Sequence, residues 1–157
     1  MGTRQALHGG SVILSIGEIL FDVFPQYRRI GGAPFNFAYH LRGLGFPVRF
    51  VSRVGKDEAG QEILSFIAGA GFTGSDIQID ADRATGTVEV ELDDEGVPRF
   101  TILENVAYDS IAFDDTVKAA LNAGPAMICF GSLIQRTRQG FSTIRRVLAD
   151  QIGRAHV

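Results

Sequence analysis

The chain is 157 residues long, which suits one domain or part of a larger one. Hydrophobic residues make up 45% of it and charged residues 21%, and the formal net charge of −3 argues against a nucleic-acid-binding surface. No apolar run approaches the roughly 20 residues that span a bilayer, and residues 1–11 lack the apolar segment of a signal peptide. We therefore expect a cytoplasmic protein without a membrane or nucleic-acid partner, beginning with a disordered arm over residues 1–11.

Residues 12–80 alternate between apolar strands and amphipathic helices. The apolar run over 12–17 predicts a buried strand, which residues 18–25 continue, with Asp22 near its end. There follow a helix over 36–44, a strand over 48–54, a helix over 58–70 and a short strand over 76–79. This order predicts a parallel sheet covered by helices.

Residues 87–103 break this rhythm. Apolar and acidic residues alternate over 87–92, an acidic turn ends at Gly96, and alternation resumes over 98–103. The pattern predicts a β-hairpin with one face in water, which makes it a candidate lid or interface element. The earlier rhythm then returns with a helix over 114–123, a strand over 126–130 and a helix over 137–150.

The single cysteine, Cys129, rules out an internal disulfide and any cysteine-based zinc site. Its neighbours in the strand are apolar, so we expect a buried residue. A reactive thiol would need electropositive and accessible surroundings. No metal site is expected in the chain.

Residues 31–36, Gly-Gly-Ala-Pro-Phe-Asn, are the strongest local signal for a binding site. Two glycines let a ligand approach the backbone, and a helix that starts directly after them leaves backbone N–H groups without partners. Asn36 adds a side chain that can donate and accept hydrogen bonds. The segment predicts a cradle for a small polyhydroxylated or anionic ligand, although a simple turn would also account for the two glycines.

Five segments in chain order resemble motifs of the PfkB, or ribokinase-like, family of carbohydrate kinases, and its fructokinase-like members most closely. They are residues 17–22, 31–38 with Gly43 and Gly45 beyond, 54–60, 85–88 and 131–136. The resemblance implies a ribokinase-like, doubly wound parallel α/β sheet with an inserted β-hairpin lid at about 86–103, truncated about halfway. This part of a kinase domain would occupy residues 12–151.

The resemblance also implies that six residues bind the sugar substrate: Asp22, Gly31, Gly32, Asn36, Asn105 and Gln135. Asp22 would accept hydrogen bonds from sugar hydroxyls, and the glycines would let the sugar approach the main chain. Asn36 would reach the sugar from the start of the first helix, while Asn105 and Gln135 would lie in sugar-side loops. The alternatives are a surface carboxylate at Asp22, a tight turn at the glycines and an N-cap at Asn36.

The hairpin would be the lid that closes over the sugar. A kinase needs a lid because water competes with the sugar hydroxyl as phosphoryl acceptor. The same strands would pair two subunits into a homodimer, and a purely structural hairpin is the alternative.

The chain lacks the motif that carries catalysis in the family. Members run to roughly two standard domain lengths, and their second half holds the ATP site and a Gly-Ala-Gly-Asp motif whose aspartate is the catalytic base. The only Gly-Ala-Gly here, residues 69–71, is followed by Phe72 and ends a helix. We therefore expect no catalytic residue and no kinase activity in this chain, with ATP and Mg²⁺ bound only by the full-length enzyme.

Two further functions stay open, and one is excluded. The first is a kinase for a nucleoside or another ribosyl compound, which could use Phe35 and Phe37 to stack on a base. The second is a sugar-binding module without catalytic activity. A dinucleotide-binding oxidoreductase is excluded, because the first turn, residues 17–21, has no Gly-x-Gly-x-x-Gly.

The last six residues, 152–157, have a different interpretation. They back-translate to a common sequencing-adapter read. We therefore expect residues 152–157 to be an adapter-derived tail without a function.

Overall fold

The computed structural model describes residues 12–152. The expected disordered arm over 1–11 and residues 153–157 of the expected tail lie outside the described residues. Within this range no helix is both long and apolar enough to cross a membrane.

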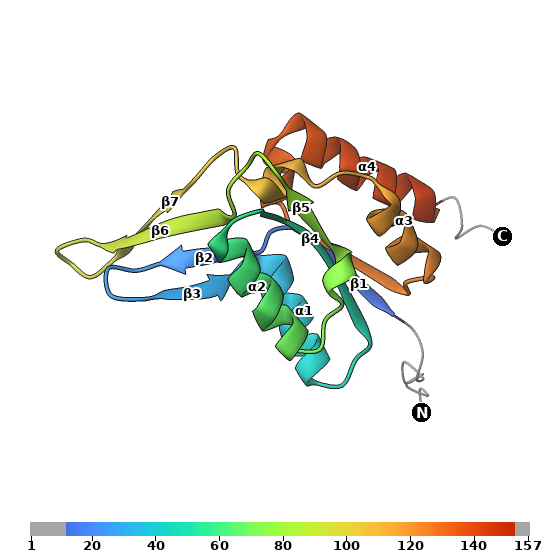
Figure 1. The fold of residues 1–157 in the computed structure, drawn as a ribbon, viewed down its shortest axis with the longest axis horizontal. Coiled ribbons are helices and arrows are strands. Elements are labelled where there is room, and N and C mark those ends of the chain that lie inside the picture. The colour runs from blue at the N-terminus through green and yellow to red at the C-terminus, as the bar shows by residue number, and fades with distance from the viewer. Residues whose placement is uncertain (1–11, 153–157) are drawn as a thin grey trace, which may run out of the picture.

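The main sheet contains four parallel strands in the order β5-β4-β1-β8 (Figure 1). Ile13 pairs with Val48 on one side and with Met127 on the other, so β1 lies at the centre. Parallel strands need crossover connections, which the intervening helices supply. The expected strands are confirmed, with bounds β1 (Ile13–Ile16), β4 (Val48–Gly55), β5 (Ile77–Asp80) and β8 (Met127–Phe130).

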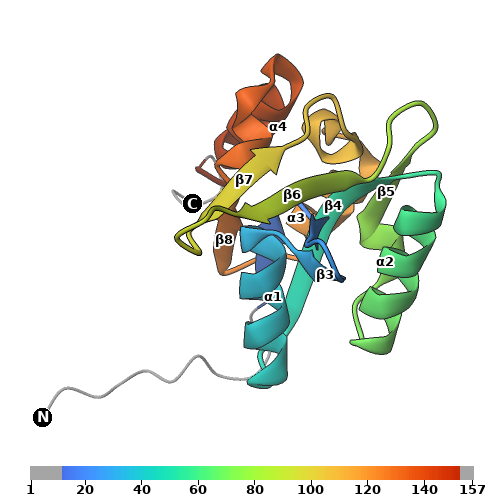
Figure 2. The same cartoon turned by 90° about the vertical axis from the view of Figure 1, so that its left-hand side faces the viewer.

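Helices cover both faces of this sheet. Leu14, Ile16 and Val51 point to the face covered by α3 and α4, while Ile13 and Phe50 point to the face covered by α1 and α2. Figure 1 shows α1 and α2 on the side of the main sheet opposite α3 and α4, and Figure 2 shows the same elements turned by 90°. The doubly wound α/β architecture is therefore confirmed. The helices are α1 (Ala33–Gly43), α2 (Glu58–Gly69), α3 (Asp115–Asn122) and α4 (Arg138–Ile152).

A second sheet, in the order β3-β2-β6-β7, extends away from the main sheet (Figure 1). It contains the expected hairpin, but β2 and β3 enlarge it to four strands. β2 pairs in parallel with β6 and antiparallel with β3, and β6 pairs antiparallel with β7. Its strands are β2 (Leu20–Val23), β3 (Arg28–Gly31), β6 (Gly86–Leu92) and β7 (Pro98–Ile102).

The expectation that residues 18–25 continue the first strand is wrong. The chain leaves the main sheet at Gly17, whose φ of 151° lies in a region that favours glycine. It then enters the second sheet as β2, so Asp22 lies on the second sheet and not at the end of β1. β3 escaped the sequence analysis because Arg28-Arg29-Ile30-Gly31 has no apolar alternation.

Cys129 is half-buried rather than buried, which corrects a second expectation. Among the described strands, β8 is an edge strand of the main sheet, and its first and last residues, Met127 and Phe130, are exposed. The apolar composition of β8 was correctly interpreted as strand. Burial of a strand depends on what covers it, which composition does not report.

Asp57 joins the base of the second sheet to α2. Its carboxylate caps the helix by accepting a hydrogen bond from the Gly60 N–H at 2.7 Å. It also accepts hydrogen bonds from the Thr85 N–H at 2.8 Å and the Thr85 hydroxyl at 2.6 Å. Burial opposes ionisation of Asp57, but these hydrogen bonds outweigh it and lower its pKa. One side chain thus holds the start of α2 and the entry to β6 together.

Gly60→Ala tests this close packing. A β-carbon at Gly60 would overlap the carbonyl oxygen of Gly55, so α2 would have to move away from β4. We expect a loss of about 1–3 kcal/mol in the free energy of unfolding, measured by urea denaturation. Gly69→Ala in the same helix is the control, because a β-carbon there meets no atom within 4 Å. A control as destabilised as Gly60→Ala would contradict the packing argument.

Candidate functional site

Three of the sequence motifs meet where β1 and β8 end. A β-carbon at Gly17 would lie 2.6 Å from Pro34 Cγ and 3.1 Å from the Gly131 nitrogen. The Gly131 N–H donates to the Ile16 carbonyl at 3.0 Å, which fixes the loop after β8 beside the end of β1. Ligands of open α/β sheets bind at the carboxyl ends of the strands, so this junction is where a site is expected.

Asp22 and Gly31 lie against each other on neighbouring strands of the second sheet. A β-carbon at Gly31 would lie 2.5 Å from Asp22 Oδ2, so only glycine leaves room for this carboxylate. Arg29 places its Nε 3.6 Å from the same oxygen, and the Asp22 side chain keeps 23% of its surface exposed. Asp22 therefore presents a carboxylate that can still accept hydrogen bonds from a ligand.

Gly32 forms the turn into α1. Its φ of 111° favours glycine, and a β-carbon would overlap the carbonyl oxygen of Glu18. Gly32 is the N-cap of α1, and its carbonyl accepts the Asn36 N–H at 2.8 Å. The helix thus begins three residues earlier than expected, and the N-cap alternative for Asn36 is wrong. The Asn36 side chain is exposed on the first turn, directly after the glycines.

A polar cavity of about 370 Å³ contains one of the six expected site residues, Asn105. Asn105 has a φ of 57° and accepts a hydrogen bond from Arg83 Nε at 3.2 Å. Arg83, Glu104, Asp109, Ser110, Arg136, Thr137 and Gln139 complete the lining. Asp22, Gly31, Gly32, Asn36 and Gln135 do not line it.

Gln135 is in the short helix η3 (Leu133–Arg136) that follows β8. Its Nε2 donates to the Gly131 carbonyl at 3.2 Å, so its amide supports the loop at the junction. The structure therefore brings Asp22 to Gly31, Gly32 to the backbone of Glu18, and Gln135 to Gly131. Asn105 lies apart from these groups, in the cavity.

Arg136 and Asp109 form a buried pair that the sequence analysis missed. Arg136 Nε and Nη2 donate to the two carboxylate oxygens of Asp109, each at 2.8 Å. Nη2 also donates to the Leu103 carbonyl at 2.6 Å, which ties the end of β7 to η3. The guanidinium lies over the Tyr108 ring, 5.4 Å from its centroid, and burial raises the pKa of Tyr108 to about 12. The bidentate geometry requires an arginine, so lysine could not replace Arg136.

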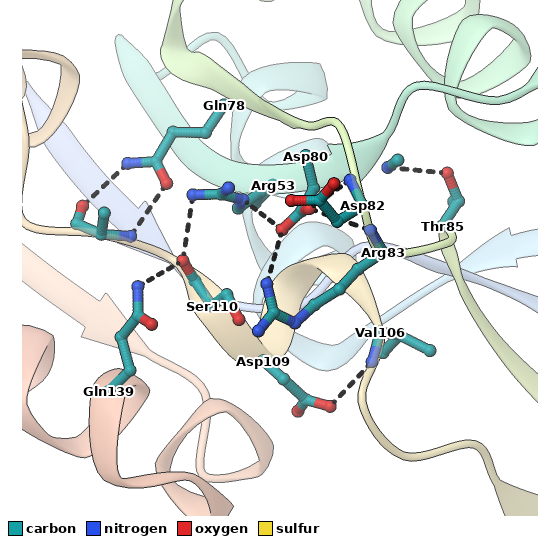
Figure 3. Close-up of polar contacts among 12 residues, drawn as sticks. Arg53, Gln78, Asp80, Asp82, Arg83, Thr85, Val106, Asp109, Ser110 and Gln139 are labelled. Atoms are coloured by element: carbon teal, nitrogen blue, oxygen red, sulfur yellow. Dashed lines mark hydrogen bonds and ion pairs between the residues drawn. The ribbon is translucent and has the colours of Figure 1, made fainter.

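Arg53, Asp80 and Arg83 form a second charge cluster beside the cavity (Figure 3). Arg53 Nε lies 2.9 Å from Asp80 Oδ2, and its Nη1 donates to the Ser110 carbonyl at 3.2 Å. Burial opposes ionisation of Asp80, but the N–H groups of Asp82 and Arg83 and the two guanidinium groups outweigh it and lower its pKa. These contacts connect the ends of β4 and β5 to the segment that leads into α3.

Glu18 is a further residue whose role the sequence did not reveal. It is 5% exposed, and its Oε2 has no hydrogen-bond partner among the described residues. Burial raises the pKa of Glu18, against the opposing effects of the N–H groups of Glu18 and Ala33 and of the positive charge of Arg136. The available signal was a carboxylate within an otherwise apolar run, since a buried ionisable group is uncommon without a role.

Metal ligation finds no support within residues 12–152. No group of three or more His, Cys, Asp or Glu side chains in this range could hold a metal ion. We therefore assign no described residue to Mg²⁺.

Comparisons with known proteins agree on one family. Residues 22–139 match the family described as pfkB family carbohydrate kinase. The chain is 26% identical to Fructokinase-1 of Zea mays over 137 residues, which cover 80% of this chain and 42% of the maize protein.

Solved structures show the same relationship. An uncharacterized sugar kinase of Pyrococcus horikoshii in complex with ATP superposes with a TM-score of 0.77 at 25% identity, covering 88% of this chain and 49% of that one. Halothermothrix orenii fructokinase superposes with a TM-score of 0.74 at 26% identity, covering 87% and 52%. The chain thus spans between two fifths and about half of these proteins.

Asp109→Ala tests the buried pair at the cavity. It would leave Arg136 without its bidentate partner, and we expect the free energy of unfolding to fall by roughly 3 kcal/mol. This is the lower end of the range for a broken buried pair, because Arg136 keeps 23% of its side chain exposed. Asp115→Ala is the control, since the Asp115 side chain is 99% exposed and its pair with Lys118 contributes little. Equal urea midpoints for the two variants would refute the role given to Asp109.

Proposed function

Because the chain belongs to the pfkB family of carbohydrate kinases, we propose that it is the sugar-binding part of an ATP-dependent, fructokinase-like enzyme. The full enzyme would transfer a phosphoryl group from ATP to a hydroxyl of a sugar such as fructose. The observation that carries the proposal is the Asp22 carboxylate held over Gly31, beside the Gly32 turn that starts α1.

The chain's own residues would bind and orient the sugar. Asp22 would accept hydrogen bonds from two hydroxyls, because an ionised carboxylate has two acceptor oxygens. Gly31 leaves the space that the Asp22 carboxylate occupies, and Gly32 packs on the backbone of Glu18, so the sugar would meet the main chain of this turn beside Asp22. Asn36 would reach the sugar from the first turn of α1. Asn105 and Gln135 remain proposed contacts from the loops after β7 and β8.

The second sheet would act as the lid. Phosphoryl transfer to a sugar requires exclusion of water, which is an alternative acceptor. The sheet is joined to the main sheet through Gly17 on one side and through Asp57 and Thr85 on the other. Closure would bring the Asp22 face of this sheet over the sugar and enclose the sugar between the lid and the start of α1.

ATP would supply the phosphoryl group, and Mg²⁺ would neutralise its charge. The Pyrococcus horikoshii kinase was solved with ATP, which supports the choice of nucleotide. No residue of this chain is proposed to hold either group, and none is proposed as catalytic base. The chain alone would then bind sugar without turnover, as a non-catalytic module. An ATP-coupled assay tests this, and turnover at roughly 1–100 per second would overturn it.

A kinase for a nucleoside or another ribosyl compound is the second candidate. Phe35 was a candidate for stacking on a base, but it is 2% exposed and packs against Phe50 and Phe72. Phe37, the other candidate, is partly buried and packs against the same core cluster. The burial of Phe35 in the core between α1 and the main sheet favours a simple sugar. Calorimetry with fructose, ribose and adenosine separates the candidates, since the proposal requires fructose to bind most tightly.

Asp22→Ala should weaken fructose binding by about 10- to 100-fold, the loss expected for hydrogen bonds to a charged group. The fructose affinity of Asp22→Asn should lie between that of the wild-type chain and that of Asp22→Ala, because an amide keeps one acceptor oxygen. Isothermal titration calorimetry of the whole chain measures the dissociation constants, with Asp115→Ala as the control. Binding that is unaffected in Asp22→Ala would remove Asp22 from the site.

We also propose that the second sheet pairs two copies of the chain. Val88 and Val90 are buried on one face, and their cross-strand partners Ile102 and Phe100 share that face. Phe100 is nevertheless 61% exposed and Ile102 is 40% exposed, so the apolar face continues beyond the protein's own core. A second copy would bury this extension, which is contiguous with the core.

Phe100→Ser should therefore shift the chain from dimer to monomer in sedimentation velocity at micromolar concentration. Phe141→Ser on α4 is the control, because Phe141 is 47% exposed but lies outside the second sheet. A wild-type chain that stays monomeric, or a control that dissociates equally, would contradict pairing through this sheet.

A further inference from the structure

We propose that Glu18 is a positioning residue that holds the Gly31–Gly32 turn and the Gly131 loop at one fixed separation. The inference rests on the proposed function, because the turn is the proposed sugar cradle. Glu18 would not touch the sugar, since its Oε2 is buried and the whole residue is 5% exposed. It would act through the backbone of Ala33 and through Gly131.

The first contact of Glu18 is with the start of α1. The Ala33 N–H interacts with the Glu18 carboxyl group and favours its ionised form, against the larger effect of burial on the pKa. Ala33 is the first residue of α1 and directly follows Gly32, the N-cap. Gly32 has no side chain to cap the free N–H groups of the helix, so Glu18 supplies this acceptor from another element. Any movement of the carboxyl group would therefore be passed to the glycine turn.

The second contact is with the loop after β8. A β-carbon at Gly131 would overlap Glu18 Oε2 and lie 3.2 Å from Pro34 Cγ. The carboxyl group thus fills the space between Gly131 and the first turn of α1. Gly32 packs against the main chain of Glu18, because a β-carbon there would overlap the backbone carbonyl oxygen of Glu18. Removing the side chain would open a void between the two segments and let them shift.

The surroundings favour an uncharged carboxyl group. Arg136 of η3, Tyr108 of η2 (Ala107–Ser110) and Cys129 of β8 are the titratable groups that interact with Glu18 electrostatically. Arg136 is engaged by Asp109, and Glu18 forms no ion pair with the described residues. A buried carboxyl without a cation partner ionises reluctantly, and burial accordingly raises its pKa. Glutamine at this position should therefore replace it well.

The stability of the fold should depend on the protonation state of Glu18. Since the pKa of Glu18 in the folded chain is raised above its unfolded value, the stabilisation from the neutral carboxyl is complete below the unfolded pKa. It is lost as the pH rises through the raised pKa. Glu18→Gln should remove this loss, so its thermal unfolding should depend less on pH than that of the wild-type chain.

Amide hydrogen exchange and calorimetry on the whole 17.0 kDa chain test the inference. In Glu18→Ala we expect exchange at Ala33 to accelerate by about tenfold, the effect of losing one hydrogen bond, with Gly131 affected in the same direction. Fructose affinity should fall by a similar factor. Glu18→Gln should restore the exchange rates and the fructose affinity of the wild-type chain. Glu95→Ala, in the exposed hairpin turn, should change neither the exchange rates nor the affinity.

The pH dependence separates positioning from a merely structural role. The Ala33 amide chemical shift should titrate together with the Glu18 carboxyl carbon in the wild-type chain, and this titration should vanish in Glu18→Gln. If Glu18→Ala fails to fold, this comparison still decides the question. An Ala33 amide that does not follow Glu18, or that exchanges at the wild-type rate in Glu18→Ala, would overturn the inference. If Ala33 responds as expected but no sugar binds the wild-type chain, the proposed function fails and the link between Glu18 and the turn stands.

Discussion

The structure depends on the close approach of three backbone segments at the ends of β1 and β8. Gly17, Pro34 and Gly131 meet there with no space for a further side chain, and Gly17 turns the chain out of the main sheet. Because β2 begins three residues later, this turn decides where Asp22 lies. The same approach brings the start of α1 beside the loop after β8. A bulkier residue at this junction would separate the sheets and, with them, the parts of the proposed cradle.

The buried carboxyl groups on the two sides of this junction have different partners. Beside the cavity, Asp109 pairs with Arg136, and Asp80 pairs with Arg53 and Arg83, so each buried carboxylate faces at least one cation. At the junction Glu18 has no ion-pair partner, and its Oε2 makes no hydrogen bond to the described residues. The arrangement at Glu18 responds to pH, since only the neutral carboxyl group suits a buried site without a cation partner.

The second sheet serves two purposes with one set of strands. Its central strands β2 and β6 place Leu20, Val88 and Val90 in the core that also contains α3 and α4. Its edge strand β7 exposes Phe100 and Ile102 on the same face as Asp22. A surface that both encloses a ligand and meets a second copy would couple sugar binding to assembly. That coupling needs no extra domain, because β2, β6 and β7 belong to one sheet.

The sequence by itself determined the order and type of most elements. Apolar runs and helical spacing located four parallel strands and four helices, because these patterns reflect burial on one or two faces. Motifs also identified the family, since glycines at turns and a carboxylate on a strand are local requirements. Asp22 and Gly31 were selected in this way, and the structure places them in contact.

Only the tertiary structure decided the rest. The arginine-rich strand β3, the exit of the chain at Gly17 and the exposure of β8 depend on which strands pair, and no local pattern encodes that pairing. Glu18 and the pair of Asp109 with Arg136 acquire their roles from segments about 15 to 115 residues away along the chain. A buried polar group is defined by its partners, and those partners exist only once the chain has folded.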